Sequence, residues 1–145
     1  MEVRSMTHSD VAQVVAIERQ IFSRPWKADD FEDAIMKDVN IYLVALKEDE
    51  LVGYVGLWGV AGEGQITNVA VSPQHRQEGI GALLMKEVEA KAKEMGIEEM
   101  TLEVRKSNLA AIRLYEKQGF VSEGIRPDFY VEPVEDAIIM WKRKK

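Results

Sequence analysis

Apolar residues follow two different periods along this chain, and the change between them predicts a mixed α/β (α+β) fold. Spacings of three and four residues indicate helices, whereas short apolar runs bounded by polar turns indicate strands. The pattern predicts strands at residues 2–6, 41–46, 51–58, 65–71, 100–104, 121–126 and 136–142. It predicts helices at residues 7–21, 29–36, 80–95 and 109–118. We therefore expect one domain over residues 1–145, with a mixed, mostly antiparallel central sheet flanked by helices on both faces.

Polar and glycine-containing turns separate these elements. Thr7 and Asp10 form a capping-box-like start to the first helix. Gly62 and Gly64 are predicted to form a turn, and the segment PDFYVEPVE (127–135) is predicted to be a loop between the last two strands. Those two strands are expected to close the sheet as an antiparallel pair.

The composition is that of a globular protein, and it limits the available chemistry. Apolar residues make up 46% and charged residues 30% of the 145 positions, which is enough apolar material for a buried core. Cys is absent and only two His are present, so a thiol nucleophile, a disulfide, a Ser-His-Asp triad and a metal site are not expected. No apolar run approaches the roughly 20 residues of a membrane span, and the N-terminus lacks a signal-peptide apolar region. We therefore expect a cytoplasmic protein without membrane contact.

The formal charge of −6, from 25 acidic and 19 basic residues, bears on the possible partners. Affinity for nucleic acid rests on neutralising phosphates, so direct nucleic-acid binding is not expected. An acidic surface favours a cationic acceptor, such as an amine or a basic peptide. Four consecutive cations at positions 142–145 end the chain; they are either a solvated terminus or a phosphate or RNA contact.

The segment RQEGIG (Arg76 to Gly81) lies between a predicted strand and a predicted helix. Its two glycines allow the backbone to approach a ligand. Free N–H groups at a helix start, together with the helix dipole, favour an anion such as a pyrophosphate. Arg76 adds a positive charge. The glycines are equally explained by a tight turn, and the segment is neither a Walker loop nor a complete dinucleotide fingerprint.

Three residues beyond this helix are candidates for chemistry or binding. Glu103 shares a strand face with Thr101 and Arg105. It is either a general base for an ammonium proton, an ion-pair partner of Arg105 or a solvated strand carboxylate. Tyr115, within the next helix, is either a core residue or a proton donor to a thiolate leaving group. Asn108 is either the N-cap of that helix or a contact to an amide-rich carrier.

Aromatic residues in predicted loops are candidates for recognition. Trp26, Phe129 and Tyr130 fall in such segments, where an aromatic ring either binds a ligand or covers the core. His75 precedes the glycine loop; we expect it to be exposed and assign it no role.

Two runs of the sequence carry a family resemblance. The runs are NVAVSPQHRQEGIGALLMKEVEAKAKEMG (68–96) and LEVRKSNLAAIRLYEKQGF (102–120). They resemble the cofactor motif R/Q-x-x-G-x-G/A, and the strand and helix that follow it, in acetyl-CoA-dependent N-acetyltransferases of the GNAT superfamily. The resemblance extends over nearly the whole chain. The segments PW (25–26), ITNVAV, LEVRKSN, DFY and EDAIIMW look like the RimI-type subfamily, bacterial enzymes that acetylate the N-terminal alanine of a ribosomal protein.

The resemblance implies acetyl-CoA as co-substrate and a role for each candidate residue. Glu103 would accept the proton of the amine, and Tyr115 would donate a proton to the departing thiolate. Acetyl-CoA would be held by Val69, Ala70, Val71, Arg76, Gln77, Glu78, Gly79, Ile80, Gly81, Ala82 and Asn108. The acceptor entrance would be lined by Pro25, Trp26, Arg126, Phe129 and Tyr130. RimI-type chains often have two adjacent tyrosines where this chain has Phe129-Tyr130, a difference that concerns peptide recognition.

Two alternatives to acetylation of a protein N-terminus stay open. One keeps acetyl-CoA but uses a small-molecule amine as the acceptor. The other is a CoA-binding interaction module without turnover. The expected partner is the N-terminus of a basic ribosomal protein, and the expected state is a monomer or weak dimer.

Overall fold

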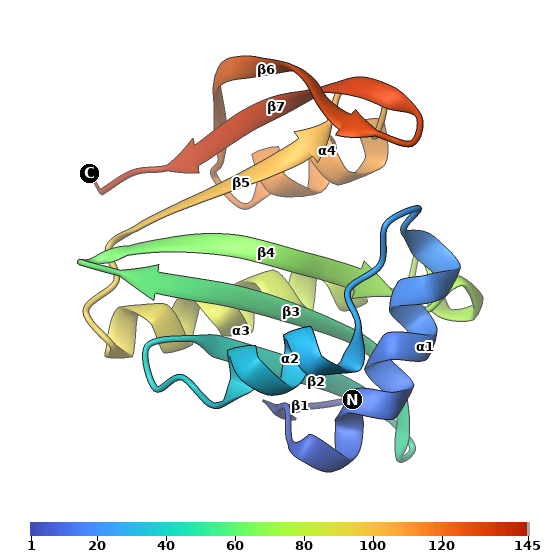
Figure 1. Cartoon of the computed structure of the whole chain (residues 1–145). Helices are drawn as coiled ribbons and strands as arrows, with labels where there is room; N and C mark the ends of the chain where they lie inside the picture. The colour runs from blue at the N-terminus through green and yellow to red at the C-terminus, as the bar shows by residue number, and fades with distance from the viewer. Residues whose placement is uncertain (145) are drawn as a thin grey trace.

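The computed structural model, which describes residues 1–144, is a seven-stranded sheet with the strand order β1-β2-β3-β4-β5-β7-β6 (Figure 1). The strands are β1 (Glu2–Ser5), β2 (Ile41–Lys47), β3 (Glu50–Val60), β4 (Glu63–Val71), β5 (Glu99–Arg105), β6 (Val121–Val131) and β7 (Val134–Lys142). The helices are α1 (Val11–Ile21), α2 (Ala28–Ile35), α3 (Ile80–Glu94) and α4 (Leu109–Lys117). Within the described part of the chain, only β4 and β5 pair in parallel, so the predicted mixed, mostly antiparallel sheet is confirmed.

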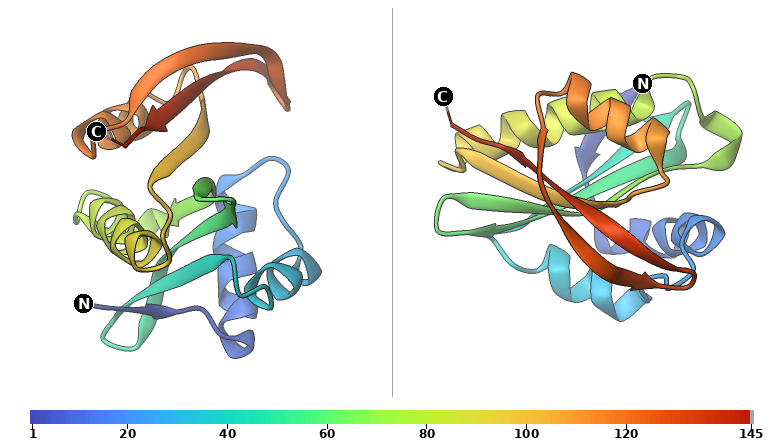
Figure 2. Two further views of the ribbon diagram at one scale, coloured as in Figure 1. Left: turned by 90° about the vertical axis from the view of Figure 1, so that its left-hand side faces the viewer. Right: turned by 90° about the horizontal axis from the view of Figure 1, so that it is seen from above.

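Helices cover both faces of the sheet, as predicted, and each face has its own apolar core (Figure 2). On one face the stripe of α3, including Leu84 and Val88, is fully buried against β2, β3 and β5. On the other face Val14 of α1 and Phe31 of α2 are fully buried against Tyr54 of β3 and its neighbours. Each such side chain stabilises the fold by about 1.5–3 kcal/mol relative to exposure. The two cores hold the sheet rigidly between the helix layers.

The two central strands separate soon after they meet. Parallel pairing of β4 with β5 covers only three residue pairs, Glu63–Gln65 with Glu99–Thr101. The register of β4 against β3 shifts at Thr67, because Ile66 pairs with Leu57 whereas Asn68 pairs with Gly56. An extra residue of this kind bends a strand and increases its twist. The second half of β4 therefore turns away from β5 and leaves the sheet open between them.

The C-terminal strands differ from the prediction. β6 and β7 extend through most of the segment predicted to be a loop and are joined by a turn at residues 132–133. Phe129 and Tyr130 therefore lie in β6 and not in a loop. Their strand is irregular, since the register shifts between Arg126 and Tyr130 and the Asp128 amide donates to the Asp136 carboxylate at 2.9 Å. A bulge with a proline and two charged neighbours has the composition of a turn, which explains the error.

Two smaller predictions also need correction or completion. Gly64 lies inside β4, where a Cβ atom would approach Leu57 to 2.8 Å, and only Gly62 is in the turn, with φ +84°.

In the basic tail, Lys142 pairs with Glu89 and Arg143 with Glu123, so these cations are not simply solvated. Lys145 lies outside the described residues. Among residues 1–144, no helix is long and apolar enough to cross a membrane.

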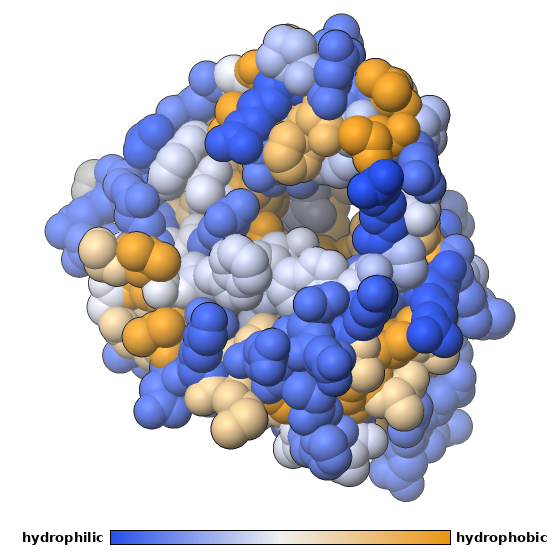
Figure 3. Space-filling model, in the orientation of Figure 1, coloured by the Kyte–Doolittle hydropathy of each residue, from blue (hydrophilic) through white to orange (hydrophobic). Residues whose placement is uncertain are grey.

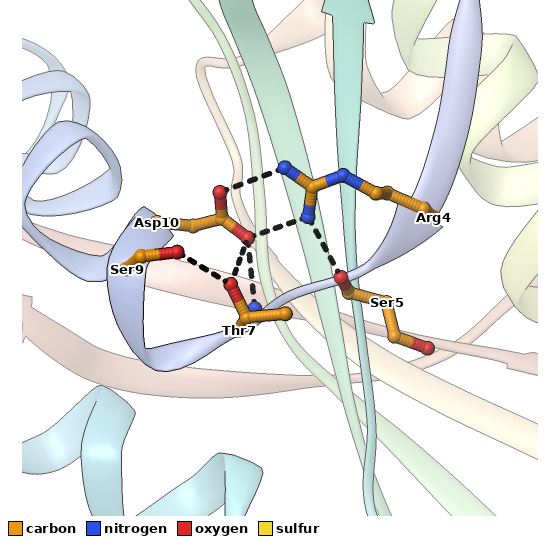
Figure 4. Close-up of polar contacts among 5 residues, drawn as sticks. All are labelled: Arg4, Ser5, Thr7, Ser9 and Asp10. Carbon is orange, nitrogen blue, oxygen red and sulfur yellow. Dashed lines mark hydrogen bonds and ion pairs between the residues drawn. The ribbon is translucent and has the colours of Figure 1, made fainter.

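The N-terminal strand is fixed to the first helix by the carboxylate of Asp10, which is 5% exposed (Figure 4). Arg4 donates two hydrogen bonds to this carboxylate, at 2.7 and 2.9 Å. The backbone N–H and the hydroxyl of Thr7 donate to its Oδ2 atom at 2.8 and 3.0 Å. The predicted capping box is confirmed, with Arg4 as an additional partner. The hydrogen bonds from Arg4 and Thr7 lower the pKa of Asp10.

We predict that Asp10→Asn destabilises the protein by about 1–2 kcal/mol at pH 7, because charge-assisted hydrogen bonds to a buried carboxylate are lost. The pKa of Asp10 is lower in the folded than in the unfolded chain. The stabilisation is therefore present at neutral pH and disappears as the pH falls through the folded-state pKa. Urea unfolding from pH 7 down to pH 3 measures the difference. The exposed Asp38→Asn is the control, and a pH-independent difference for Asp10→Asn would contradict this account.

Candidate active site

The glycine loop leads into α3 in the conformation that an anion site requires. Gln77 and Gly79 have positive φ angles of 65° and 80°, and Gly79 is the N-cap residue of α3. The amide of Leu83 is the first to bond back within the helix, to the Gly79 carbonyl at 3.1 Å. The amides of Ile80, Gly81 and Ala82 precede it and so have no partner within the helix. Together with the helix dipole they favour a bound anion.

Gly81 marks the place where three elements meet. A Cβ atom at this position would lie 3.2 Å from the Leu114 side chain of α4 and 3.9 Å from Val71 of β4. At Gly79 a Cβ atom would meet nothing within 4 Å. The start of α3, the end of β4 and helix α4 are thus in close contact, while the loop itself faces open space. No side chain or backbone atom therefore blocks the approach of a ligand at Gly79.

The side chains of the loop have different surroundings. Arg76 is exposed. The Glu78 carboxylate lies 2.9 Å from the Lys47 ammonium, which offsets its charge, and 3.5 Å from the His75 ring. The hydrogen bond from Lys47 lowers the pKa of Glu78. His75 is only 17% exposed in its side chain, which corrects the expectation that it is exposed.

The end of β4 presents a free strand edge toward the opening. The Ser72 amide donates to the Val52 carbonyl of β3 at 2.8 Å. Hydrogen-bonded positions alternate along an antiparallel pair, so Ala70 also bonds to β3, whereas the backbone groups of Val69 and Val71 point away from it. Since β5 has diverged at this level, these groups lie on an open edge. An extended molecule can bind there as an added strand would.

Glu103 lies on β5 across the opening, and its side chain is 16% exposed. As predicted, it shares a strand face with Thr101 and Arg105, because the alternate positions of β5 are the buried ones. Its Oε2 atom lies 3.2 Å from the Arg126 Nε atom, and Gln65 donates to its Oε1 atom at 3.5 Å. Of the alternatives for Glu103, an ion pair with Arg105 is not found. Arg105 instead lies 3.2 Å from Glu135.

Two tyrosines extend from the other elements around the opening. Tyr115 of α4 is 8% exposed and packs edge-on against Phe120, with ring centroids 6.1 Å apart. Burial raises the pKa of Tyr115, and the nearby Tyr130 adds to the rise. Burial and the Glu103 carboxylate raise the pKa of Tyr130 to about 12. Both phenols therefore stay protonated at neutral pH, as a proton donor must, and Tyr115 is at the same time a core residue.

Asn108 has the capping role that the sequence allowed. Its side-chain oxygen accepts a hydrogen bond from the Ala111 amide at 3.2 Å, which makes it the N-cap of α4. Asn108 as a whole is exposed. A contact to a ligand at this place is compatible with the cap and stays a prediction.

The loop between α1 and α2 is held by a buried carboxylate, Glu18, which is 2% exposed. Its oxygens accept hydrogen bonds from the Trp26 amide at 3.0 Å and from the Tyr54 hydroxyl at 2.5 Å. Asn68 of β4 adds a longer one at 3.5 Å. Burial raises the pKa of Glu18, and the hydrogen bonds oppose the rise. Glu18 thus fixes the position of Trp26 relative to β3 and β4.

The same loop contacts the turn between β6 and β7. Arg24 donates to the Glu132 carboxylate at 3.2 and 3.3 Å. Arg105 donates to the carbonyl groups of Glu132 and Pro133, at 3.1 and 3.0 Å, and its guanidinium lies 4.3 Å from the centre of the Tyr130 ring. These contacts join the two sides of the opening at one end. The predicted acceptor residues Trp26, Arg126, Phe129 and Tyr130, with Pro25, are therefore distributed over both sides.

Sequence reasoning missed several residues of this region. Glu18, Gln65, Asn68 and Arg105 were not among the candidates. Glu18, Gln65 and Arg105 each contact a candidate, and Asn68 contacts Glu18. Only Glu18 left a signal in the sequence. It continues the apolar spacing of Val11 and Val14 on α1, so a carboxylate interrupts a stripe that is otherwise buried.

The chain has close relatives among known proteins. Residues 11–120 match the profile of the acetyltransferase (GNAT) family. The chain is 39% identical over 140 residues to the putative ribosomal protein bS18-alanine N-acetyltransferase of Bacillus subtilis (strain 168), covering 96% of this chain and 93% of that protein. It is 30% identical over 141 residues to the ribosomal protein bS18-alanine N-acetyltransferase of Escherichia coli (strain K12), covering 95% and 94%. The crystal structure of the ribosomal-protein-S18-alanine N-acetyltransferase from Escherichia coli superposes with a TM-score of 0.90 at 27% identity, covering 99% and 95%.

Proposed function

The chain belongs to the acetyltransferase (GNAT) family and is an acetyl-CoA-dependent N-acetyltransferase, and from this premise we propose that it acetylates the N-terminal alanine of ribosomal protein bS18. Two relatives with this named activity align with it over more than nine-tenths of both chains. The observation that carries the proposal is the convergence of the glycine loop, the open edge of β4 and helix α4 at Gly81. A carboxylate, Glu103, lies across the opening from this point.

We propose that acetyl-CoA binds along this convergence. The amides of residues 77–82 would hold the diphosphate, with Arg76 adding positive charge. The backbone groups of Val69 and Val71 would hydrogen-bond the pantetheine arm in the manner of an added strand, and Asn108 would contact the arm further along. This arrangement would direct the thioester into the opening between β4 and β5.

The proposed reaction is a direct attack of the α-amine on the thioester. The amine is mostly protonated at neutral pH because its pKa is near 8, so Glu103 first takes a proton from the ammonium, directly or through water. The nitrogen then forms a bond to the thioester carbon while the Val71 N–H donates to the carbonyl oxygen as its charge grows. The C–S bond breaks, the thiolate takes a proton from Tyr115, and the attacking nitrogen releases its second proton to water. Water in turn returns a proton to Tyr115, so the products are a neutral amide and a free thiol. Holding both substrates in one opening supplies much of the acceleration.

Intact-mass analysis of bS18 tests the proposed substrate. Incubation of the purified enzyme with acetyl-CoA and bS18 whose N-terminal Met has been removed should add about 42 Da, the mass of one acetyl group, and peptide sequencing should locate it on the N-terminal amine. Free polyamines and amino acids serve as competing acceptors in parallel reactions. Turnover of these amines without modification of bS18 would assign the enzyme to small molecules, and the absence of any acceptor-dependent turnover would indicate a binding module.

We predict that Glu103→Gln lowers kcat by about 10²-fold or more at pH 7, the usual contribution of a general base. The loss should shrink as the pH rises above about 8, because the α-amine then loses its proton without help. Initial rates between pH 6 and 9.5 with saturating acetyl-CoA measure the effect. Glu116→Gln, an exposed carboxylate on α4, is the control. A deficit that stays constant over this range would remove Glu103 from the role of base.

We predict that Tyr115→Phe lowers kcat by about 10²-fold while the KM for acetyl-CoA changes little, because the variant keeps the ring in the core and removes only the proton donor. Tyr130→Phe, which removes a hydroxyl on the acceptor side, should mainly raise the KM for the peptide. Steady-state kinetics with both substrates varied separate the two effects. A Tyr115→Phe enzyme with weakened acetyl-CoA binding and unchanged kcat would indicate a structural role.

A further inference from the structure

A second feature of the acceptor side is a cavity of about 340 Å³ between α2 and β3. It is lined by Trp26, Asp30, Asp33, Ala34, Lys37, Asn40 and Trp58. None of the proposed catalytic steps uses this cavity. Its lining combines two indole rings with carboxylates, a combination that binds cations.

The aromatic wall consists of Trp26 and Trp58, whose ring centroids are 6.0 Å apart. Trp26 also packs against Phe31 at 5.0 Å, within the core beneath α2. Trp58 is 42% exposed although it lies on a central strand. A large, rigid indole surface is therefore available at the edge of the cavity. The face of an indole ring attracts Lys and Arg side chains more strongly than other aromatic rings do.

The charged wall is supplied mainly by α2. This helix, ADDFEDAI, carries four carboxylates and no Lys or Arg. Asp30 and Asp33 line the cavity, and among residues 1–144 neither is in a salt bridge, although Asp30 caps the Lys27 amide at 2.9 Å. Lys37 is the one cation of the lining, so the cavity keeps a net negative charge.

The cavity lies on the same sheet face as the proposed catalytic base. Trp58 of β3 pairs with Gln65 of β4, and cross-strand partners project on one face. Gln65 in turn donates to Glu103 of β5 at 3.5 Å. Glu103 lies two residues beyond Thr101, the strand partner of Gln65. Since neighbouring strands are about 4.8 Å apart and a strand covers about 3.3 Å per residue, Trp58 is roughly 12 Å from Glu103. Figure 3 shows this face, hollowed between the strands β3 and β4 and the layer formed by β6 and β7.

We propose that this cavity is a subsite for the cationic side chain, Arg or Lys, of a residue near the acceptor's N-terminus. The inference rests on the proposed function, because it assumes an acceptor chain whose amine lies at Glu103. An extended peptide covers about 3.3 Å per residue, so the second to fourth residues come within reach of Trp58. The cation would stack on the indoles and face the carboxylates of Asp30 and Asp33. Such a subsite selects basic N-terminal segments among the many chains that begin with alanine.

The experiment compares six-residue peptides that start with Ala and carry one Arg at position 2, 3 or 4, each matched with the same peptide containing citrulline. Citrulline keeps the shape of Arg and removes its charge. The wild-type enzyme should show a kcat/KM about three- to tenfold higher for Arg than for citrulline at one of these positions. Asp33→Asn and Trp58→Leu should reduce this ratio toward 1. Asp29→Asn, with the same charge change on α2 but outside the cavity lining, should retain it.

Each other outcome has a distinct meaning. Equal rates for Arg and citrulline peptides at all three positions would overturn the subsite and leave N-terminal acetylation intact. A preference for Arg that persists in both Asp33→Asn and Trp58→Leu would also overturn it, because residues outside the cavity would then recognise the charge. If the enzyme acetylates none of the Arg or citrulline peptides and also fails to acetylate bS18, the proposed function is wrong, and the subsite proposal fails with it.

Discussion

The early separation of β4 from β5 is the constraint on which the rest of this structure depends. A sheet normally continues its hydrogen bonding along the full length of neighbouring strands, but here the pairing stops after three residue pairs. The bulge at Thr67 bends β4 away, and the backbone groups of Val69 and Val71 are left without a strand partner. Buried backbone groups are nearly always paired. An open edge in the middle of a sheet is therefore stable only where a ligand or water can complete it.

The helices around this opening are arranged to keep it open. α3 and α4 pack on one face and meet at Gly81, where any larger residue would press on Leu114. On the other face Glu18 ties the loop before α2 to β3 and β4. A buried carboxylate costs several kcal/mol unless its oxygens accept hydrogen bonds. Its partners come from three separate segments, so a shift of any one of them would leave the charge poorly satisfied, and the loop is held in one position.

The sequence predicted local structure well in segments where the apolar residues follow a single helical or strand period. The stripe of α3, the strand face of Glu103 and the capping box at Asp10 all follow from spacing within one element. The structure confirms them except at Met95, which was predicted to end the buried stripe but is 46% exposed beyond the last turn of α3. The bulge between Arg126 and Tyr130 was missed because its residues have the composition of a turn. Glu18 with its partners was missed because their contacts join residues 8 to 50 positions apart. The assignments of acetyl-CoA contacts and catalytic roles came from family resemblance, and they remain predictions.

The contact between Arg24 and Glu132 has a consequence for which molecules can enter. Both side chains are more than half exposed, and an ion pair of this kind is worth at most about 1 kcal/mol. The ion pair closes one end of the opening between β4 and β5 only weakly. Arg105, in contrast, holds the turn between β6 and β7 through hydrogen bonds to its backbone carbonyls. A free chain end can slide beneath such a bridge or displace it at little energetic cost. An internal segment of a folded surface would have to bring two backbone segments past the same contact, so under the proposed function this contact favours a free chain end over an internal lysine.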